Sequence, residues 1–310
     1  MKEGALKLVR DIDDPSLIMN LLREYIQAFT LRSFHESKVF RCLSFVGGTA
    51  LRFLYALPRF SEDLDFSLED SEGYDPKAWL KKIKRDLAFS GFNAAVTWND
   101  SRTVNTGWIR VAELMRDAGL TDLPEQKISI KLEIDTNPPA GAVMENSVIN
   151  RHMIFALRHH DLPSLLAGKI HALCTRKYIK GRDWYDIIWY GARRPPVKPN
   201  IQFLENALTQ TGKEELGKAQ QWSGYLIAQL DEVDQTKFVK DSEPFLEEPK
   251  EINLLTKENI KKRLYNFMEN KAYFCVRETS TPFYLTAREC NRDLSLGSSS
   301  PDNRHTLNLY

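Results

Sequence analysis

The hydrophobic and polar positions of the first 158 residues follow helical spacing in some segments and strand-like alternation in others. Apolar residues between Leu17 and Phe29 recur every three or four positions, which predicts a helix over residues 15–43. Asp75 and Pro76 are typical of a helix cap and first turn, so a second long helix is expected over residues 75–90. Strands are expected at residues 44–47, 63–68, 92–98, 105–115, 127–135 and 152–158. The pattern predicts an α/β (α+β) fold with a mixed sheet flanked by helices.

Helical periodicity dominates the rest of the chain. Helices are expected at residues 161–178, 183–192, 201–210, 213–230, 235–246 and 257–274. We therefore predict a catalytic domain at residues 1–158, followed by a helical C-terminal domain at residues 159–275 that completes a cleft. Residues 276–310 lack periodicity, and they are expected to form a poorly ordered or peripherally packed tail.

Composition narrows the class of protein. A chain of 310 residues can hold two domains, and its net charge of +1 means that any site for a polyanion must be a local patch. Cys42, Cys174, Cys275 and Cys290 show neither zinc-site spacing nor a disulfide framework, which favours a reducing cytoplasm. The charged N-terminus does not resemble a signal peptide, and no apolar run reaches the ~20 residues of a membrane span.

A glycine turn followed by an acidic strand carries the strongest chemical signal. Gly47–Thr49 precede a predicted helix, and glycines there leave backbone N–H groups free to meet a phosphate. Side chains alternate along a strand, so Asp63 and Asp65 are expected on one face while Leu64 and Phe66 enter the core. Paired carboxylates on a rigid edge suit Mg²⁺. The alternative is a surface turn with an acidic strand end.

This segment resembles the AbiEii/AbiGii-type nucleotidyltransferase toxins, which belong to the DNA polymerase β-like nucleotidyltransferases. The resemblance rests on Gly-Gly-Thr-x-Leu at residues 47–51, then Tyr55, Arg59, Ser61 and Asp63-x-Asp65-Phe66, and it extends over residues 40–190. It implies a nucleotidyltransferase-like fold, an NTP substrate and Mg²⁺ (or Mn²⁺) on Asp63 and Asp65. It also implies that Gly47, Gly48, Thr49 and Ser61 hold phosphate and that Arg59 flanks it, although Arg59 could instead be a solvated turn residue.

The strand Lys131–Asp135 could supply a third carboxylate. Ile130, Leu132 and Ile134 are expected in the core, which leaves Glu133 and Asp135 on the other face. An edge strand with a solvated charged face would be the simpler interpretation. Because the resembled family has a Lys-apolar-acid strand at this place in the chain, we expect Glu133, rather than Asp135, to join the metal site.

Two further motifs lie in the predicted helices after residue 160. Lys169 points along the apolar stripe of its helix, where it either meets an anion or extends its ammonium to water. The resemblance makes it a phosphate-binding catalytic lysine. Asp183 and Asp186 share a helix face, and they resemble the Arg-Asp-x-x-Asp motif, whose aspartate the family needs for activity. Either aspartate could instead act structurally, Asp183 as a cap and Asp186 as the partner of Arg182 or Lys169.

Basic and aromatic residues are interleaved between Arg176 and Arg194, as in surfaces that bind unpaired RNA, although these aromatics could equally form helix core. The resemblance implies a toxin of a toxin–antitoxin or phage-defence system that transfers a nucleotide from an NTP to the tRNA 3′ end or another RNA. A cognate antitoxin is a possible further partner. The alternatives are a kinase-like phosphotransferase or a nuclease with the same carboxylates, or a non-catalytic module that binds a nucleotide or a partner protein.

Overall fold

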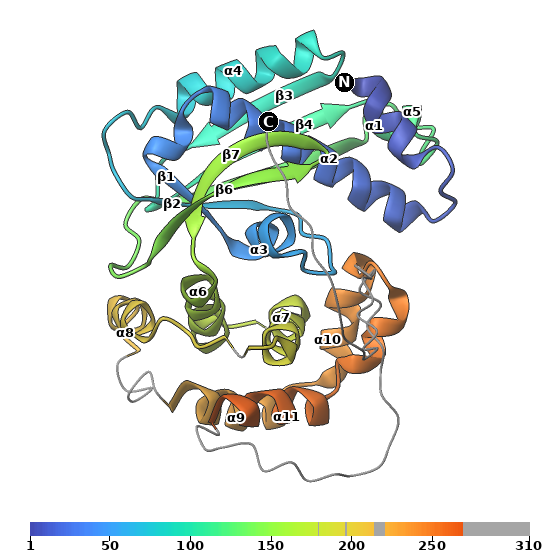
Figure 1. Cartoon of the computed structure of the whole chain (residues 1–310). Helices are drawn as coiled ribbons and strands as arrows, with labels where there is room; N and C mark the ends of the chain where they lie inside the picture. The colour runs from blue at the N-terminus through green and yellow to red at the C-terminus, as the bar shows by residue number, and fades with distance from the viewer. Residues whose placement is uncertain (179, 196, 214–220, 269–310) are drawn as a thin grey trace, which may run out of the picture. The chain divides into compact units, whose positions relative to one another are not determined.

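A computed structural model describes residues 1–178, 180–195, 197–213 and 221–268. It contains a mixed seven-stranded sheet flanked by helices, with the strand order β3-β4-β5-β2-β1-β7-β6 (Figure 1). The fold class predicted from the sequence is therefore confirmed. The strands are β1 (Leu43–Val46), β2 (Leu64–Leu68), β3 (Asn93–Asn99), β4 (Val104–Ala112), β5 (Lys127–Asp135), β6 (Met144–Arg151) and β7 (Met153–His160). β2 pairs with β5 in parallel and with β1 antiparallel, which places β2 at the middle of the sheet.

Helices α2 (Pro15–Glu36) and α4 (Pro76–Phe89) pack on the sheet face that carries Leu64 and Phe66. Asp14 caps α2 by accepting from the backbone N–H of Ser16, and Pro15 fits its first turn. The expected continuation of this helix to residue 43 is wrong. The helix ends at Glu36 because Lys38 has a φ of 59°, and the 3₁₀ turn Val39–Arg41 leads into β1.

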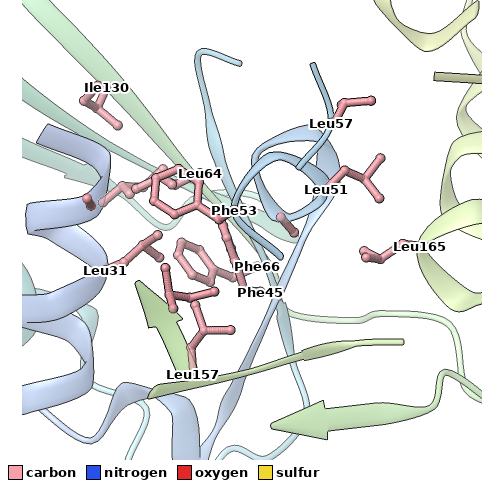
Figure 2. Close-up of a cluster of buried hydrophobic side chains, with 14 of the residues drawn as sticks. Leu31, Phe45, Leu51, Phe53, Leu57, Leu64, Phe66, Ile130, Leu157 and Leu165 are labelled. Carbon is pink, nitrogen blue, oxygen red and sulfur yellow. The ribbon is translucent and has the colours of Figure 1, made fainter. Parts of the chain in front are cut away.

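The core between α2 and the sheet is made of apolar side chains from segments far apart in the sequence (Figure 2). Leu31 of α2 lies beside Phe45 of β1, Phe66 of β2 and Leu157 of β7, and these four side chains are almost completely buried. Phe45 and Phe66 are paired across adjacent strands, with ring centroids 5.4 Å apart. This packing fixes the strand register, and it holds the opposite face of β2 toward the site.

Helix α3 (Gly47–Tyr55) lies between the sheet and a set of helices from the second half of the chain (Figure 1). These are α6 (Leu162–Thr175), α7 (Gly181–Ala192), α8 (Ile201–Gln210), α9 (Trp222–Glu232), α10 (Gln235–Ser242) and α11 (Lys257–Met268). The helix expected at 161–178 is thus shorter, and the one expected at 235–246 changes at Glu243–Phe245 into a 3₁₀ turn. Parts of the helices expected at 213–230 and 257–274, and the predicted tail at 276–310, lie outside the described residues.

Two helices and a strand were not expected from the sequence: α1 (Lys2–Val9), α5 (Leu114–Asp117) and β6. Backbone pairing attaches the loop before β2 to the second half of the chain. Arg59 forms an isolated β-bridge with Leu246, and the backbone N–H of Phe60 donates to the carbonyl of Phe245 at 2.7 Å. The 3₁₀ segment Pro249–Leu254 follows. These contacts position the loop that carries Arg59 and Ser61.

Candidate active site

The glycine turn brings the start of α3 into contact with the acidic strand. Gly47 has a φ of +79°, and a Cβ on it would lie 2.2 Å from Oδ2 of Asp65. A Cβ on Gly48 would lie 2.8 Å from Nη2 of Arg59 and 3.2 Å from Oγ of Ser61. Both positions therefore need glycine, for the backbone conformation at Gly47 and for space at both residues. No side chain in the described ranges caps α3, so its first N–H groups remain for an anion.

Asp63 and Asp65 line one hollow of about 240 Å³, together with Gly47 and Gly48. Asp65 lies on β2 and Asp63 directly before it, where its backbone carbonyl accepts from the hydroxyl of Thr49. Within the described residues, neither carboxylate receives a hydrogen bond from a side chain or forms an ion pair. The structure thus brings two unneutralised carboxylates to the rim of one cavity.

The surroundings disfavour negative charge on both groups. Burial, reinforced by the charges of Asp63 and Glu133, raises the pKa of Asp65 to about 7. Burial also raises the pKa of Asp63, against the opposing charge of Lys180. A divalent cation between these carboxylates would reverse this repulsion, so the donor set fits Mg²⁺ or Mn²⁺. In the described part of the chain, no three acidic, histidine or cysteine side chains already converge on one metal position.

Two residues of β5, Glu133 and Asp135, share the properties expected of the third carboxylate. β5 lies between β2 and β4, so the alternative of an edge strand is wrong. Glu133 is the direct strand partner of Asp65, but its Oε1 lies 2.6 Å from Nζ of Lys131. Asp135 is instead the partner of Ser67, and both line the hollow. Glu133 adds negative charge beside Asp65, and Asp135 lies at the cavity itself.

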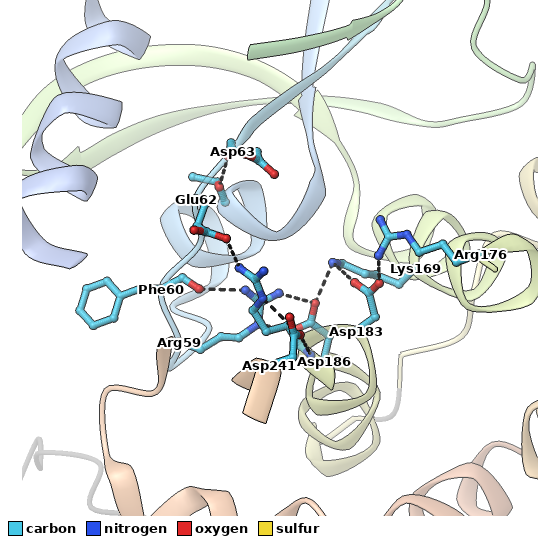
Figure 3. Close-up of polar contacts among 11 residues, drawn as sticks. Arg59, Phe60, Glu62, Asp63, Lys169, Arg176, Asp183, Asp186 and Asp241 are labelled. Atoms are coloured by element: carbon cyan, nitrogen blue, oxygen red, sulfur yellow. Dashed lines mark hydrogen bonds and ion pairs between the residues drawn. The ribbon is translucent and has the colours of Figure 1, made fainter. Parts of the chain in front are cut away.

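Lys169 of α6 lies across the hollow from the acidic strand, in contact with both aspartates of α7 (Figure 3). Its Nζ is 2.9 Å from Oδ1 of Asp183 and 2.8 Å from Oδ2 of Asp186. Burial lowers the pKa of Lys169, but these two carboxylates outweigh burial and raise it. The ammonium is therefore held charged at the cavity wall.

Asp183 and Asp186 have different partners besides Lys169. Asp183 lines the hollow and also pairs with Arg176. Burial raises the pKa of Asp183, but the charges of Lys169 and Arg176 outweigh burial and lower this pKa to about 2. Asp186 is fully buried and accepts two hydrogen bonds from Arg59, Nε to Oδ1 at 2.7 Å and Nη2 to Oδ2 at 2.6 Å. Arg59 is therefore a buried partner of Asp186, and the alternative of a solvated turn residue is wrong.

The hollow contains two further cations that the sequence identified only as part of a basic cluster, without assigning them to the site. Arg176 and Lys180 line the cavity with Lys169. Burial lowers the pKa of Lys180, against the charge of Asp183. The neighbouring aromatic residues are mostly core, since Trp184, Tyr185 and Tyr190 are buried. The cavity thus combines carboxylates on the sheet side with cations on the helical side, as the binding of a metal–phosphate group requires.

Comparison with protein families gives one match that covers most of the chain. The model of the family "Nucleotidyl transferase AbiEii toxin, Type IV TA system" matches residues 30–273. The chain belongs to the AbiEii nucleotidyltransferase toxin family. This membership confirms the family resemblance, and it supports a nucleotidyltransferase toxin that takes a nucleotide substrate and has an antitoxin partner.

The fold of the chain resembles that of one solved structure. A "putative nucleotidyltransferase" from H. pylori is 17% identical with a TM-score of 0.51, over 82% of this chain and 98% of that one. JHP933 from Helicobacter pylori is 18% identical with a TM-score of 0.42, over 80% and 88% of the two chains. No curated protein matches the chain. None of the helices in the described ranges has the length and apolar character needed to cross a bilayer.

Proposed function

We propose that this AbiEii protein is a Mg²⁺-dependent enzyme that transfers a nucleotide from an NTP to an RNA acceptor such as the tRNA 3′ end. The observation that supports this is the pair of carboxylates Asp63 and Asp65, which form no ion pair with any described residue and lie in one cavity with Lys169 and the start of α3. We place the activity in the cytoplasm, where NTPs and tRNA are both available, and we expect growth arrest as its outcome and a cognate antitoxin as its counterpart.

The chain's own residues have separate tasks in this proposal. Asp63 and Asp65 would hold Mg²⁺ or Mn²⁺, with Glu133 adding negative charge beside them. The metal ion would neutralise phosphate charge as the α-phosphorus is attacked and pyrophosphate leaves. The backbone N–H groups of residues 47–49 and the hydroxyl of Ser61 would orient the phosphates.

Cations on the helical side would neutralise the departing pyrophosphate. Lys169 is placed at the wall by Asp183 and Asp186, and Arg176 and Lys180 lie beside it. Arg59 acts indirectly, because its bidentate contact fixes Asp186 and thereby Lys169. Positioned charges of this kind supply most of the catalysis in phosphoryl and nucleotidyl transfer.

A labelled-nucleotide assay tests the proposal. The full chain is incubated with Mg²⁺, total RNA or purified tRNA, and each NTP in turn, labelled at the α- or the γ-phosphate. We expect α-label on RNA, and Asp65→Asn should remove it because an amide cannot replace the anionic metal ligand. γ-label on RNA would instead indicate a kinase, and shortened RNA a nuclease.

Growth separates an enzyme from a binding module. Expression of the wild-type chain should arrest growth, and Asp63→Ala should abolish the arrest while the protein stays folded. If arrest persisted in a folded Asp63→Ala variant, the biological effect would come from binding alone, and the proposed catalysis would not explain it.

A further inference from the structure

Two more hollows continue from the candidate active site across the sheet. The hollow of the active site shares Asp63 with a second one of about 480 Å³, lined among others by Arg23, Trp108 and Lys127. The second shares Trp108 with a third of about 500 Å³ at the β3–β4 hairpin, which includes Arg102. The three hollows thus form a series that begins at Asp63 and extends beyond Trp108.

Strand register places most of the strand residues that line this series on one face of the sheet, while Met19 and Arg23 reach the second hollow from α2. Glu133 is paired with Asp65 on one side and with Thr106 on the other, and Trp108 is paired with Lys131 and with Thr97. Residues on this face of β4 and β5 alternate with buried apolar ones and are themselves partly exposed. The face that carries Asp65 therefore continues across β5, β4 and β3 as an accessible surface.

The side chains of this face suit single-stranded nucleic acid. Trp108 is partly exposed, and the guanidinium of Arg110 lies 5.1 Å from the centre of its ring. Arg102, Arg110 and Lys127 form no ion pair with any residue that the structure describes. An aromatic ring with unneutralised cations around it is the arrangement on which unpaired bases stack while their phosphates meet positive charge.

The position of the second hollow fits the acceptor of the transfer. In an in-line transfer, the attacking hydroxyl approaches the α-phosphorus from the side opposite the pyrophosphate. The active-site hollow is lined by three cations that would hold the triphosphate: Lys169, Arg176 and Lys180. The second hollow adjoins Asp63 and lacks these three cations, which leaves it for the group that carries the hydroxyl.

We propose that the face of β3, β4 and β5 binds the single-stranded 3′ end of the RNA acceptor, with an unpaired base stacked on Trp108 and phosphates at Arg102, Arg110 and Lys127. The direction in which the RNA lies rests on the proposed nucleotidyl transfer, because the attacking 3′-hydroxyl must then lie in the hollow next to Asp63. The RNA binding itself is separately measurable.

Binding of a short single-stranded RNA with a fluorescent 5′ end and a free 3′-hydroxyl, followed by anisotropy, tests the surface. Trp108→Ala should raise the Kd for this RNA roughly tenfold or more, because base stacking is lost, while Trp108→Phe retains most of the affinity. The matched control is Trp189→Ala. Trp189 is also partly exposed beneath an arginine (Arg193, 4.7 Å from the ring centre), but it lies on α7 and lines none of the three hollows.

Kinetics and salt dependence complete the test. Trp108→Ala should raise the KM for RNA and leave NTP binding, measured calorimetrically, unchanged. Arg102→Gln and Lys127→Gln should each lower the slope of log Kd against log salt concentration by about 0.7. An unchanged RNA Kd in a folded Trp108→Ala variant, or an equal loss in Trp189→Ala, would overturn the assignment.

The experiments distinguish failure of the proposed RNA-binding surface from failure of the proposed nucleotidyl transfer. If RNA binding depends on Trp108 but no α-label is transferred, the surface assignment stands and nucleotidyl transfer to RNA fails. If α-label is transferred equally well by the wild type and by Trp108→Ala at limiting RNA, transfer stands and the surface assignment fails. If Trp108→Ala weakens binding of a protein partner and leaves RNA binding intact, the face belongs to that protein instead.

Discussion

The two aspartates of α7, Asp183 and Asp186, differ in their surroundings, so the loss of each should affect the protein differently. Asp186 is fully buried and is the side-chain anion that holds the buried guanidinium of Arg59. Asp183 faces the cavity, and its partner Arg176 is about one-third exposed. The loss of Asp186 would leave a buried charge without its counter-ion, whereas Arg176 can turn to water and Lys169 keeps Asp186 when Asp183 is lost.

We therefore expect Asp186→Asn to lower the free energy of unfolding by about 3 kcal/mol, because it breaks one side of a buried pair. Asp183→Asn should cost about 1–2 kcal/mol, since it removes one charged hydrogen bond from a lysine that keeps another. At a temperature where both variants are folded, Asp183→Asn should still show reduced transfer. Urea denaturation and the α-label assay measure the two effects, and equal losses of stability would contradict the distinction.

At the scale of elements, Glu24 joins three segments of the first half of the chain. From α2 it contacts Arg52 of α3 at 2.5 Å, Arg151 at the end of β6 at 2.9 Å, and His152 in the following turn at 2.8 Å. Burial raises the pKa of Glu24, but the hydrogen bond to His152 and the charges of Arg52 and Arg151 outweigh it and lower the pKa to about 2. The carboxylate thus holds α2, α3 and the β6–β7 hairpin together.

Glu24→Gln should destabilise the protein by about 3 kcal/mol at neutral pH, the equivalent of a pKa lowered from 4.5 to about 2. Because the folded-state pKa lies below the unfolded one, this stabilisation is complete above about pH 5 and is lost as the pH falls through 4.5 toward 2. The difference in unfolding free energy between wild type and variant, measured in urea from pH 7 to pH 3, should shrink accordingly. A difference that stayed constant with pH would show that the charge of Glu24 is not what joins these elements.

Those elements and site residues could be predicted whose positions follow from a pattern within one short segment of the sequence. Gly47, Asp63 and Asp65 lie within one turn–helix–strand segment, so alternation alone places both aspartates on one face. The end of α2 could not be predicted, because the left-handed backbone of Lys38 has no glycine to mark it. The register that sets Glu133 beside Asp65, and the pairing of Arg59 with Asp186 across 127 residues, depend on long-range packing that no local pattern encodes.

At the scale of the whole molecule, the active site belongs to both halves of the chain. The sheet supplies the carboxylates and the glycine turn, while α6 and α7 supply the lysine and the aspartates that fix it. One continuous core includes Leu51 of α3, Leu165 of α6 and Leu264 of α11. Arg182 of α7 also reaches Glu62 in the loop before β2, at 2.9 Å. The two halves therefore share contacts across residue 158, and their division into two domains at that residue stays a prediction.

This continuity predicts one cooperative unfolding transition for residues 1–158 and the helices that follow. A core shared by both halves means that neither can lose its packing without exposing the other. Hydrogen exchange pulsed across a urea series and read by mass spectrometry should give the same midpoint for peptides from β2 and β5 as for peptides from α7 and α11. Asp186→Asn should shift both midpoints by the same amount, because its partner Arg59 lies in the first half and Asp186 in the second. If the helical peptides exchanged at a lower urea concentration than the sheet peptides, the halves would be separate folding units, and Lys169 would be positioned only while they are docked.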